Sequence, residues 1–263
     1  MTERKDNHYD GTLSGYEGVG KFYDLFADNS DIPFFLECAK RFGSPILDLA
    51  AGTGRVSFAL AEKGYEVVSL ERSSSMLEVA RNRLKSADET IAGKLTITEG
   101  NMIQFNLDRK FSLIIIPNSF GHALSTDDQL SVLRCVHNHL ADFGTFILDL
   151  YPGSHQHEHA HFKENPVSLP DGTTVEREGE IHSDPIRQLM DFKLRYIIRD
   201  LTGKIIDEIR VDSPAALLYT REVDLLLRLT GFHVEEEFGD FDRNPYGHDS
   251  TRRILILKKS IEE

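Results

Sequence analysis

The stretch ILDLAAGTGRVSFAL, residues 46–60, decides the fold of this chain. A short apolar strand comes first, an Ala/Gly turn follows, and an apolar helical pattern begins near Gly54. Gly52 and Gly54 let a ligand approach the backbone closely, and the first turn of the helix directs backbone N–H groups toward it. Because ligands of open α/β sheets bind outside the carboxyl ends of the strands, this unit predicts a ligand site.

The rest of the chain repeats the alternation of strand and helix. Because the strands are near-continuous runs of Ile, Leu and Val, they predict a parallel sheet with helices on both faces. Two helices, 16–28 and 31–42, are expected before the first strand. The predicted strands are 45–50, 65–71, 94–99, 111–117, 143–151, 232–238 and 252–259, and the predicted helices between them are 54–63, 74–86, 126–141 and 220–230.

One segment, 152–215, breaks this rhythm. After a His-rich start it alternates polar and apolar residues, which predicts antiparallel strands exposed on one face. We therefore expect residues 15–151 and 216–263 to form the α/β domain, with 152–215 inserted as an antiparallel lid that binds the acceptor. Residues 1–14 are polar and aperiodic, which predicts a disordered tail.

Composition narrows the possible functions. The 263 residues carry a net charge of −13, which disfavours nucleic acid as a partner. The two cysteines have no metal-type spacing, and no apolar segment resembles a signal peptide or is long enough to cross a bilayer. We therefore expect a cytoplasmic protein that does not bind a membrane.

Asp48 discriminates between two classes of cofactor. A carboxylate beside a pyrophosphate is a like-charge clash, whereas a carboxylate beside a cation is favourable, and more so in a partly buried site. The pattern GTGRVS also has Ser57 where a dinucleotide fingerprint has its third glycine. Both observations disfavour NAD, although Asp48 could instead accept hydrogen bonds from the turn amides. Glu71 can accept hydrogen bonds from ribose hydroxyls, which suits either cofactor.

Three motifs at this spacing, DLAAGTGR (48–55), LERSSSMLEVAR (70–81) and EGNM (99–102), resemble the class I S-adenosylmethionine-dependent methyltransferases. The resemblance implies S-adenosyl-L-methionine as the cofactor. It also implies a Rossmann-like sheet of seven strands, mostly parallel with the last strand antiparallel.

The same resemblance implies roles for individual residues. The turn 50–54 would contact the methionine part, Glu71 the ribose, and Arg72 and Met76 the surroundings of the adenine. The family usually has Asp where this chain has Asn101, whose carbonyl oxygen can still accept a bond from the adenine amine. The cofactor-binding residues that we expect are Tyr23, Asp48, Ala50, Gly52, Thr53, Gly54, Arg55, Glu71, Arg72, Met76, Asn101, Met102, Pro117 and Asn118, and no metal ligand is expected.

The loop PNSFGHALS, residues 117–125, leaves the carboxyl end of a strand and should line the methyl group of the cofactor. It lacks the Asn/Asp-Pro-Pro-Tyr-type motif of methyltransferases that act on nucleic acids and protein amides. Together with YEGVGKFYDLF (16–26) and YTREVDLLLRLTGF (219–232), it is similar to the N-methyltransferases of nucleotide-linked aminosugars. In those enzymes a tyrosine and a histidine line the acceptor site, and the matching positions are Tyr16 and His122.

We therefore expect transfer of a methyl group to N or O of a small-molecule acceptor. His122 is a candidate general base, and the alternative is that it only packs or forms hydrogen bonds within the loop. Asp149 could bind a cationic acceptor or cap a neighbouring helix. Two other functions stay open: a regulatory protein that binds the cofactor without catalysis, and an NAD-dependent oxidoreductase.

Four histidines alternate in the run HQHEHAH, residues 155–161. In a strand they would share one face and could bind a metal, but they follow Pro-Gly, so a surface loop is favoured. The exposed face of the insertion is also a candidate interface for a homo-oligomer.

Overall fold

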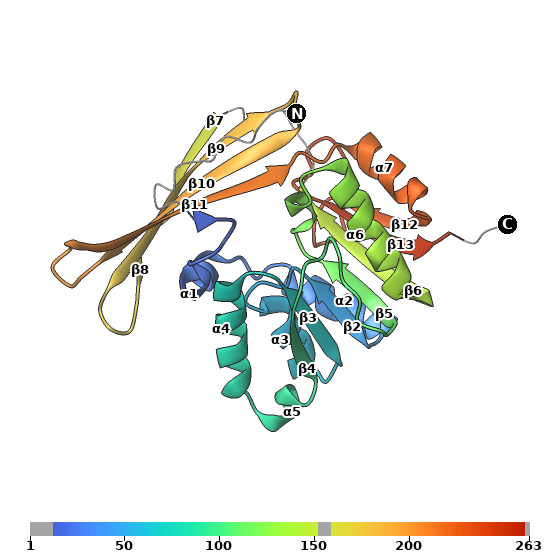
Figure 1. Cartoon of the computed structure of the whole chain (residues 1–263), viewed down its shortest axis with the longest axis horizontal. Helices are drawn as coiled ribbons and strands as arrows, with labels where there is room; N and C mark the ends of the chain where they lie inside the picture. Colours follow the sequence, from blue (N-terminus) through green and yellow to red (C-terminus); the bar gives the residue numbers. More distant parts are fainter. Residues whose placement is uncertain (1–12, 152–158, 261–263) are drawn as a thin grey trace.

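The computed structural model describes residues 13–151 and 159–260, which form two sheets (Figure 1). The larger sheet has seven strands in the order β12-β13-β6-β5-β2-β3-β4. Only β13 runs antiparallel to its neighbours, which confirms the predicted class I arrangement. The strands are β2 (Ile46–Leu49), β3 (Val67–Glu71), β4 (Leu95–Glu99), β5 (Phe111–Ile116), β6 (Leu140–Leu150), β12 (Phe232–Phe238) and β13 (Arg253–Lys259).

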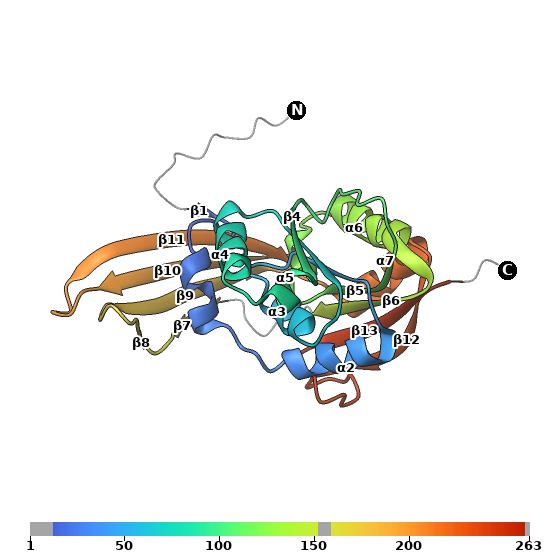
Figure 2. The same ribbon diagram turned by 90° about the horizontal axis from the view of Figure 1, so that it is seen from below.

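Helices cover both faces of this sheet (Figure 2). Ile46 packs in one core with α2 (Ile32–Phe42) and α3 (Arg55–Glu62), whereas Leu47 and Leu49 pack in the other with α6 (Thr126–His139) and α7 (Thr220–Leu229). Because successive side chains of a strand point to opposite faces, Asp48 shares the α3 face with Ile46. The chain also forms α4 (Ser74–Lys85), the short α5 (Glu89–Ala92) and the 3-10 turn η2 (Phe120–His122).

The second sheet is built mainly from the predicted insertion. Its order is β1-β11-β10-β9-β7, with β8 paired to β9, and every pair is antiparallel except β1–β11. The strands are β1 (Leu13–Ser14), β7 (His159–Lys163), β8 (Val167–Ser168), β9 (Thr174–Asp184), β10 (Leu189–Arg199) and β11 (Ile205–Ala216). Of the tail predicted over residues 1–14, all but the two residues of β1 lie outside the described residues.

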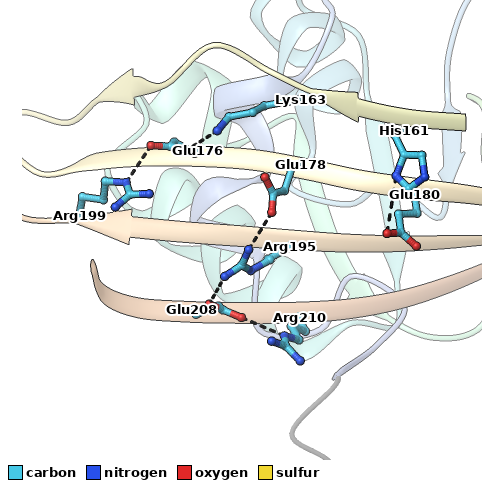
Figure 3. Close-up of polar contacts among 9 residues, drawn as sticks. All are labelled: His161, Lys163, Glu176, Glu178, Glu180, Arg195, Arg199, Glu208 and Arg210. Carbon is cyan, nitrogen blue, oxygen red and sulfur yellow. Dashed lines mark hydrogen bonds and ion pairs between the residues drawn. The ribbon is translucent and has the colours of Figure 1, made fainter. Parts of the chain in front are cut away.

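The two faces of the second sheet differ in chemistry. One face is apolar, and its Tyr196 and Val211 pack with Val19 and Phe22 from the N-terminal segment. The other face carries ion pairs, among them Lys163–Glu176, which joins β7 to β9, and the chain Glu178–Arg195–Glu208–Arg210, which joins β9, β10 and β11 (Figure 3). Exposed pairs of this kind contribute about 0–1 kcal/mol each, so the apolar face anchors the sheet.

Two predictions about local structure were wrong. The helix expected over 16–28 is only a short α1 (Gly20–Tyr23) followed by a 3-10 turn, η1 (Asp24–Phe26). The reason lies at Gly18, whose φ of 78° interrupts a right-handed helix.

The histidine run also differs from the favoured loop. His159 and His161 lie in β7, whereas the earlier histidines of the run lie outside the described residues. Across residues 13–151 and 159–260, no group of three or more His, Cys, Asp or Glu is placed to hold a metal ion. No helix in the same ranges is long and apolar enough to cross a membrane.

Candidate active site

The carboxyl ends of the parallel strands β2 to β6 meet at one edge of the sheet, and most of the predicted site residues lie at these ends or shortly after them. The turn after β2 has positive φ at Ala50 (54°), Gly52 (61°) and Gly54 (82°). A Cβ atom on Gly54 would lie 3.1 Å from the Phe58 ring, so this glycine leaves room for Phe58 at the start of α3 and adopts the positive φ without strain.

Asp48 is the buried carboxylate of this turn, with 1% of its surface exposed. The Ser57 hydroxyl donates a hydrogen bond to its Oδ2 (2.6 Å), whereas its Oδ1 has no hydrogen-bond partner among the described residues. Burial raises the pKa of Asp48 to about 7, against the effects of Ser57 and Arg55. The donor is thus Ser57 rather than a turn amide, and one buried oxygen is left for a cation or a donor.

Glu71, at the end of β3, accepts hydrogen bonds from the turns after β2 and β3. Its Oε2 accepts the Gly52 N–H (2.8 Å), and its Oε1 accepts the N–H groups of Arg72 (2.8 Å) and Ser73 (2.7 Å). An ionised carboxylate has about four lone-pair sites, so Glu71 can still accept a bond from a ribose hydroxyl.

The N-terminal segment brings acidic residues to the site that the sequence analysis missed. Asp24 Oδ1 accepts the Thr53 hydroxyl (2.7 Å), and Asp31 Oδ2 accepts Arg55 Nη2 (2.7 Å) in a two-bond pair. Arg55, which we expected to bind the cofactor, is therefore already paired. No short-range pattern signals these contacts, because they join residues more than twenty positions apart.

The residues expected around the adenine lie in, or shortly after, the turns that follow β3 and β4. Met76 and Met102 are buried, with 3% and 7% exposed, whereas Arg72 and Asn101 are exposed. Asn101 Oδ1 accepts the Ile103 N–H (3.0 Å), and this oxygen keeps a second lone pair.

The two predicted acceptor-site residues lie together. The rings of Tyr16 and His122 meet edge-on with their centroids 6.0 Å apart, and Tyr23 meets Tyr16 at 5.3 Å. His122 Nδ1 lies 3.3 Å from the Pro214 carbonyl oxygen of β11. Burial lowers the pKa of His122, although the hydrogen bond with Pro214 acts against it. Pro117 and Asn118, which begin the loop that carries His122, follow β5 directly, and Asn118 has a φ of 47°.

Asp149 stands near the end of β6 and is 1% exposed. Arg252 Nη1 lies 3.4 Å from both of its carboxylate oxygens, which is a long contact for an ion pair. Burial raises the pKa of Asp149 to about 6, against the effects of Arg252 and the Asn118 backbone. Asp48 on β2 and Asp149 on β6 are thus carboxylates at this edge of the sheet that are each 1% exposed.

Comparison with known proteins gives this geometry a context. Residues 46–144 match the family model described as a methyltransferase domain. The putative methyltransferase YqeM of Bacillus subtilis is 23% identical over 258 residues, which cover 93% of this chain and 97% of that protein. The dTDP-3-amino-3,4,6-trideoxy-alpha-D-glucopyranose N,N-dimethyltransferase of Streptomyces venezuelae is 30% identical over 135 residues, which cover 51% of this chain and 53% of that protein.

Solved structures match over nearly the whole chain. The CcbJ methyltransferase of Streptomyces caelestis superposes with a TM-score of 0.76 at 22% identity, covering 96% of this chain and 100% of its own. An amino pentose methyltransferase of Micromonospora echinaspora, solved with S-adenosylmethionine bound, has a TM-score of 0.66 at 17% identity and covers 90% and 94%. At these identities the likeness establishes the fold, including the antiparallel sheet.

Proposed function

From the premise that this chain is a class I methyltransferase that uses S-adenosylmethionine, we propose that it methylates an amine nitrogen of a small polar molecule. The names of similar proteins support nitrogen as the acceptor atom, since they include an N,N-dimethyltransferase and an amino pentose methyltransferase. The observation that carries the proposal is the half-buried His122 imidazole beside Tyr16.

The residues of the first two turns fit the cofactor. Asp48 keeps a buried oxygen that a cationic ligand would satisfy, and Glu71 has lone-pair capacity for a ribose. When bound, S-adenosylmethionine supplies a methyl group on a sulfonium, which is already activated for transfer. We assign the methionine part to Asp48 and the turn 50–54, and the ribose to Glu71. The adenine would lie among Arg72, Met76, Asn101 and Met102.

His122 suits the role of a base for an amine. The Pro214 carbonyl oxygen can only accept, so the hydrogen bond requires Nδ1 to donate. A neutral imidazole in this tautomer has its lone pair on Nε2. Because burial lowers the pKa of His122, the ring is neutral at pH 7 and can take a proton from an ammonium group before that nitrogen attacks.

Asp149 suits the attraction of that ammonium group. Its carboxylate is buried and only loosely paired to Arg252, so an additional cation would stabilise the ionised form. We assign Asp149 to the acceptor side, because its strand lies beside β5, which precedes the His122 loop.

The antiparallel sheet is our proposed cover of the acceptor pocket. Its strand β11 contacts His122 through Pro214, and a Cβ on Gly121 would lie 3.5 Å from Ala215. The sheet therefore forms the boundary of the site on the side opposite the cofactor turns.

The test is a panel of paired acceptors, each amine matched with the alcohol of the same skeleton, including amino sugars and glycine. Release of S-adenosylhomocysteine measures the transfer. We expect turnover with at least one amine and none with its alcohol, and we expect His122→Asn to abolish that turnover while S-adenosylhomocysteine still binds. Turnover of the alcohols alone, or full activity of His122→Asn, would overturn the assignment.

A further inference from the structure

The N-terminal segment 15–26, here called the strap, lies between the antiparallel sheet and α4 (Figure 1). We propose that Glu17 is a positioning residue that holds the strap closed over the cofactor and thereby places Tyr16 at the acceptor site. This inference rests on the proposed cofactor site and goes beyond the roles assigned above.

Glu17 binds the start of α4 with both of its carboxylate oxygens. Its Oε2 accepts the Ser73 hydroxyl (2.8 Å) and the Ser74 N–H (3.1 Å), and its Oε1 accepts the Ser74 hydroxyl (2.6 Å) and the Ser75 N–H (3.0 Å). Although desolvation opposes it, hydrogen bonds from Ser74 and Ser73 lower the pKa of Glu17, so the carboxylate is ionised at pH 7. The first N–H groups of a helix favour such an anion, and here it comes from a distant segment.

The backbone of the strap also touches α4 closely. The Gly18 N–H donates to the Ser75 hydroxyl (3.0 Å), and that hydroxyl donates to the Tyr16 carbonyl oxygen (3.2 Å). A Cβ atom on Gly20 would lie 2.3 Å from the Ser75 carbonyl oxygen, so only glycine permits this approach. The residue that Glu17 follows, Tyr16, is thus fixed by the same contacts.

The strap contacts the turns after β2, β3 and β5 at the candidate site. Besides the Glu17 contacts after β3, Asp24 binds Thr53 in the turn after β2, and Tyr16 meets His122 in the loop after β5. On its other side, the strap joins the antiparallel sheet through the Gly15 N–H and the Asp212 carbonyl oxygen (2.8 Å). A ligand on Glu71 would therefore lie beneath the strap.

Ser73 links the strap to Glu71, the carboxylate that we assign to the ribose. Its N–H donates to Glu71 and its hydroxyl donates to Glu17, so one residue holds both carboxylates. A bound nucleoside that engages Glu71 therefore acts on the residue that anchors Glu17. Cofactor occupancy and the position of Tyr16 are coupled through this residue.

The experiment measures exchange of S-adenosylhomocysteine, without any acceptor, by surface plasmon resonance on the full chain. Glu17→Gln retains the size of the side chain but removes its charge and half of its acceptor capacity. We expect its dissociation rate constant to rise by about 10-fold or more, since hydrogen bonds to charged groups are worth about one to two decades in an equilibrium constant. The association rate constant should stay equal or rise. Glu78→Gln, at an exposed position of α4, is the matched control and should exchange like the original chain.

A merely structural role gives a different result. It would lower the fraction of the protein that can bind the ligand, so the apparent association rate constant would fall while the dissociation rate constant stayed unchanged. That outcome overturns the proposal. Rate constants equal to those of the original chain overturn it as well. Glu17→Asp should restore part of the slow dissociation, and Ser74→Ala provides a milder loss if Glu17→Gln does not fold. Because no acceptor is present, failure of the amine proposal leaves this result intact, and failure here leaves amine transfer measurable.

Discussion

Ser57 and Asp48 form a buried hydrogen bond of 2.6 Å between the first turn of α3 and the end of β2. Ser57 also lies 2.9 Å from the Ser69 hydroxyl on β3. The serine that stands at the third glycine position of a dinucleotide fingerprint thus supports a carboxylate, which is the opposite of what a pyrophosphate would need.

Replacing Asp48 with Asn should weaken the binding of S-adenosylmethionine more than the binding of S-adenosylhomocysteine. The amide retains the size of the side chain but removes the charge, so we expect binding of cationic S-adenosylmethionine to weaken by about 10-fold or more. S-adenosylhomocysteine, which lacks the sulfonium, should lose less. Isothermal titration with both ligands measures the difference, and equal losses would show that Asp48 does not recognise the positive sulfur centre.

The pH dependence of binding follows from the same carboxylate. Because its pKa is about 7 without ligand and a cation favours the ionised form, S-adenosylmethionine should bind more weakly as the pH falls from 8 to 6. Asp48→Asn should flatten this dependence. An unchanged slope in the variant would assign the titration to another group.

The stability of the ligand-free protein should show the opposite trend. The folded pKa of Asp48 lies above its ordinary value of 3.8, so the unfolded chain binds fewer protons between the two values. The contribution of this group is therefore fully present below about pH 4 and is lost as the pH rises toward 7, by up to about 1.4 kcal/mol per pH unit. Urea unfolding of Asp48→Asn and the original chain across this range isolates the contribution.

Glu71 has a matched control on the neighbouring strand. We expect Glu71→Gln to weaken S-adenosylhomocysteine binding by about 10-fold to 100-fold, because it loses charged hydrogen bonds to ribose and turn. Glu99 is the register partner of Glu71 on β4 and is exposed, so Glu99→Gln should bind normally. Equal effects in both variants would contradict a specific role for Glu71.

Replacing Arg253 should lower the free energy of unfolding without changing the candidate site. The guanidinium is 4% exposed and donates to Glu237 (2.7 Å), Asp224 (2.6 Å) and the Thr220 carbonyl oxygen (3.0 Å). Arg253→Met should cost about 1–3 kcal/mol of unfolding free energy, because a buried guanidinium loses its hydrogen bonds while the acidic partners, 40% and 35% exposed, stay solvated. Arg210→Met, at an exposed pair, should change it by less than about 1 kcal/mol in thermal or urea unfolding.

Much of the fold could be predicted because its signals are local. The apolar runs of β2, β3 and β5 and the glycine turn after β2 predict a parallel sheet, the family resemblance implies its seven strands, and the alternating pattern identifies β9 to β11. Ser73 directly precedes the predicted helix 74–86 and caps α4, since its hydroxyl accepts the Met76 N–H (3.4 Å).

The features that could not be predicted depend on contacts distant in sequence. The periodicity of 16–28 describes a helix, but the positive φ at Gly18 and the approach of Gly20 to Ser75 outweigh it. Glu17 and Asp24 reach the site through contacts with Ser73 and Thr53, which lie 56 and 29 positions away, and no pattern near them signals these contacts.

The close packing at Gly20 has a consequence for how such an enzyme can lose its function. A substitution there to alanine would leave every charge, donor and nucleophile in place. The one added methyl group would nevertheless collide with the Ser75 backbone, against which the strap packs. Activity would then be lost because the strap is displaced, although every residue with a proposed chemical role is still present.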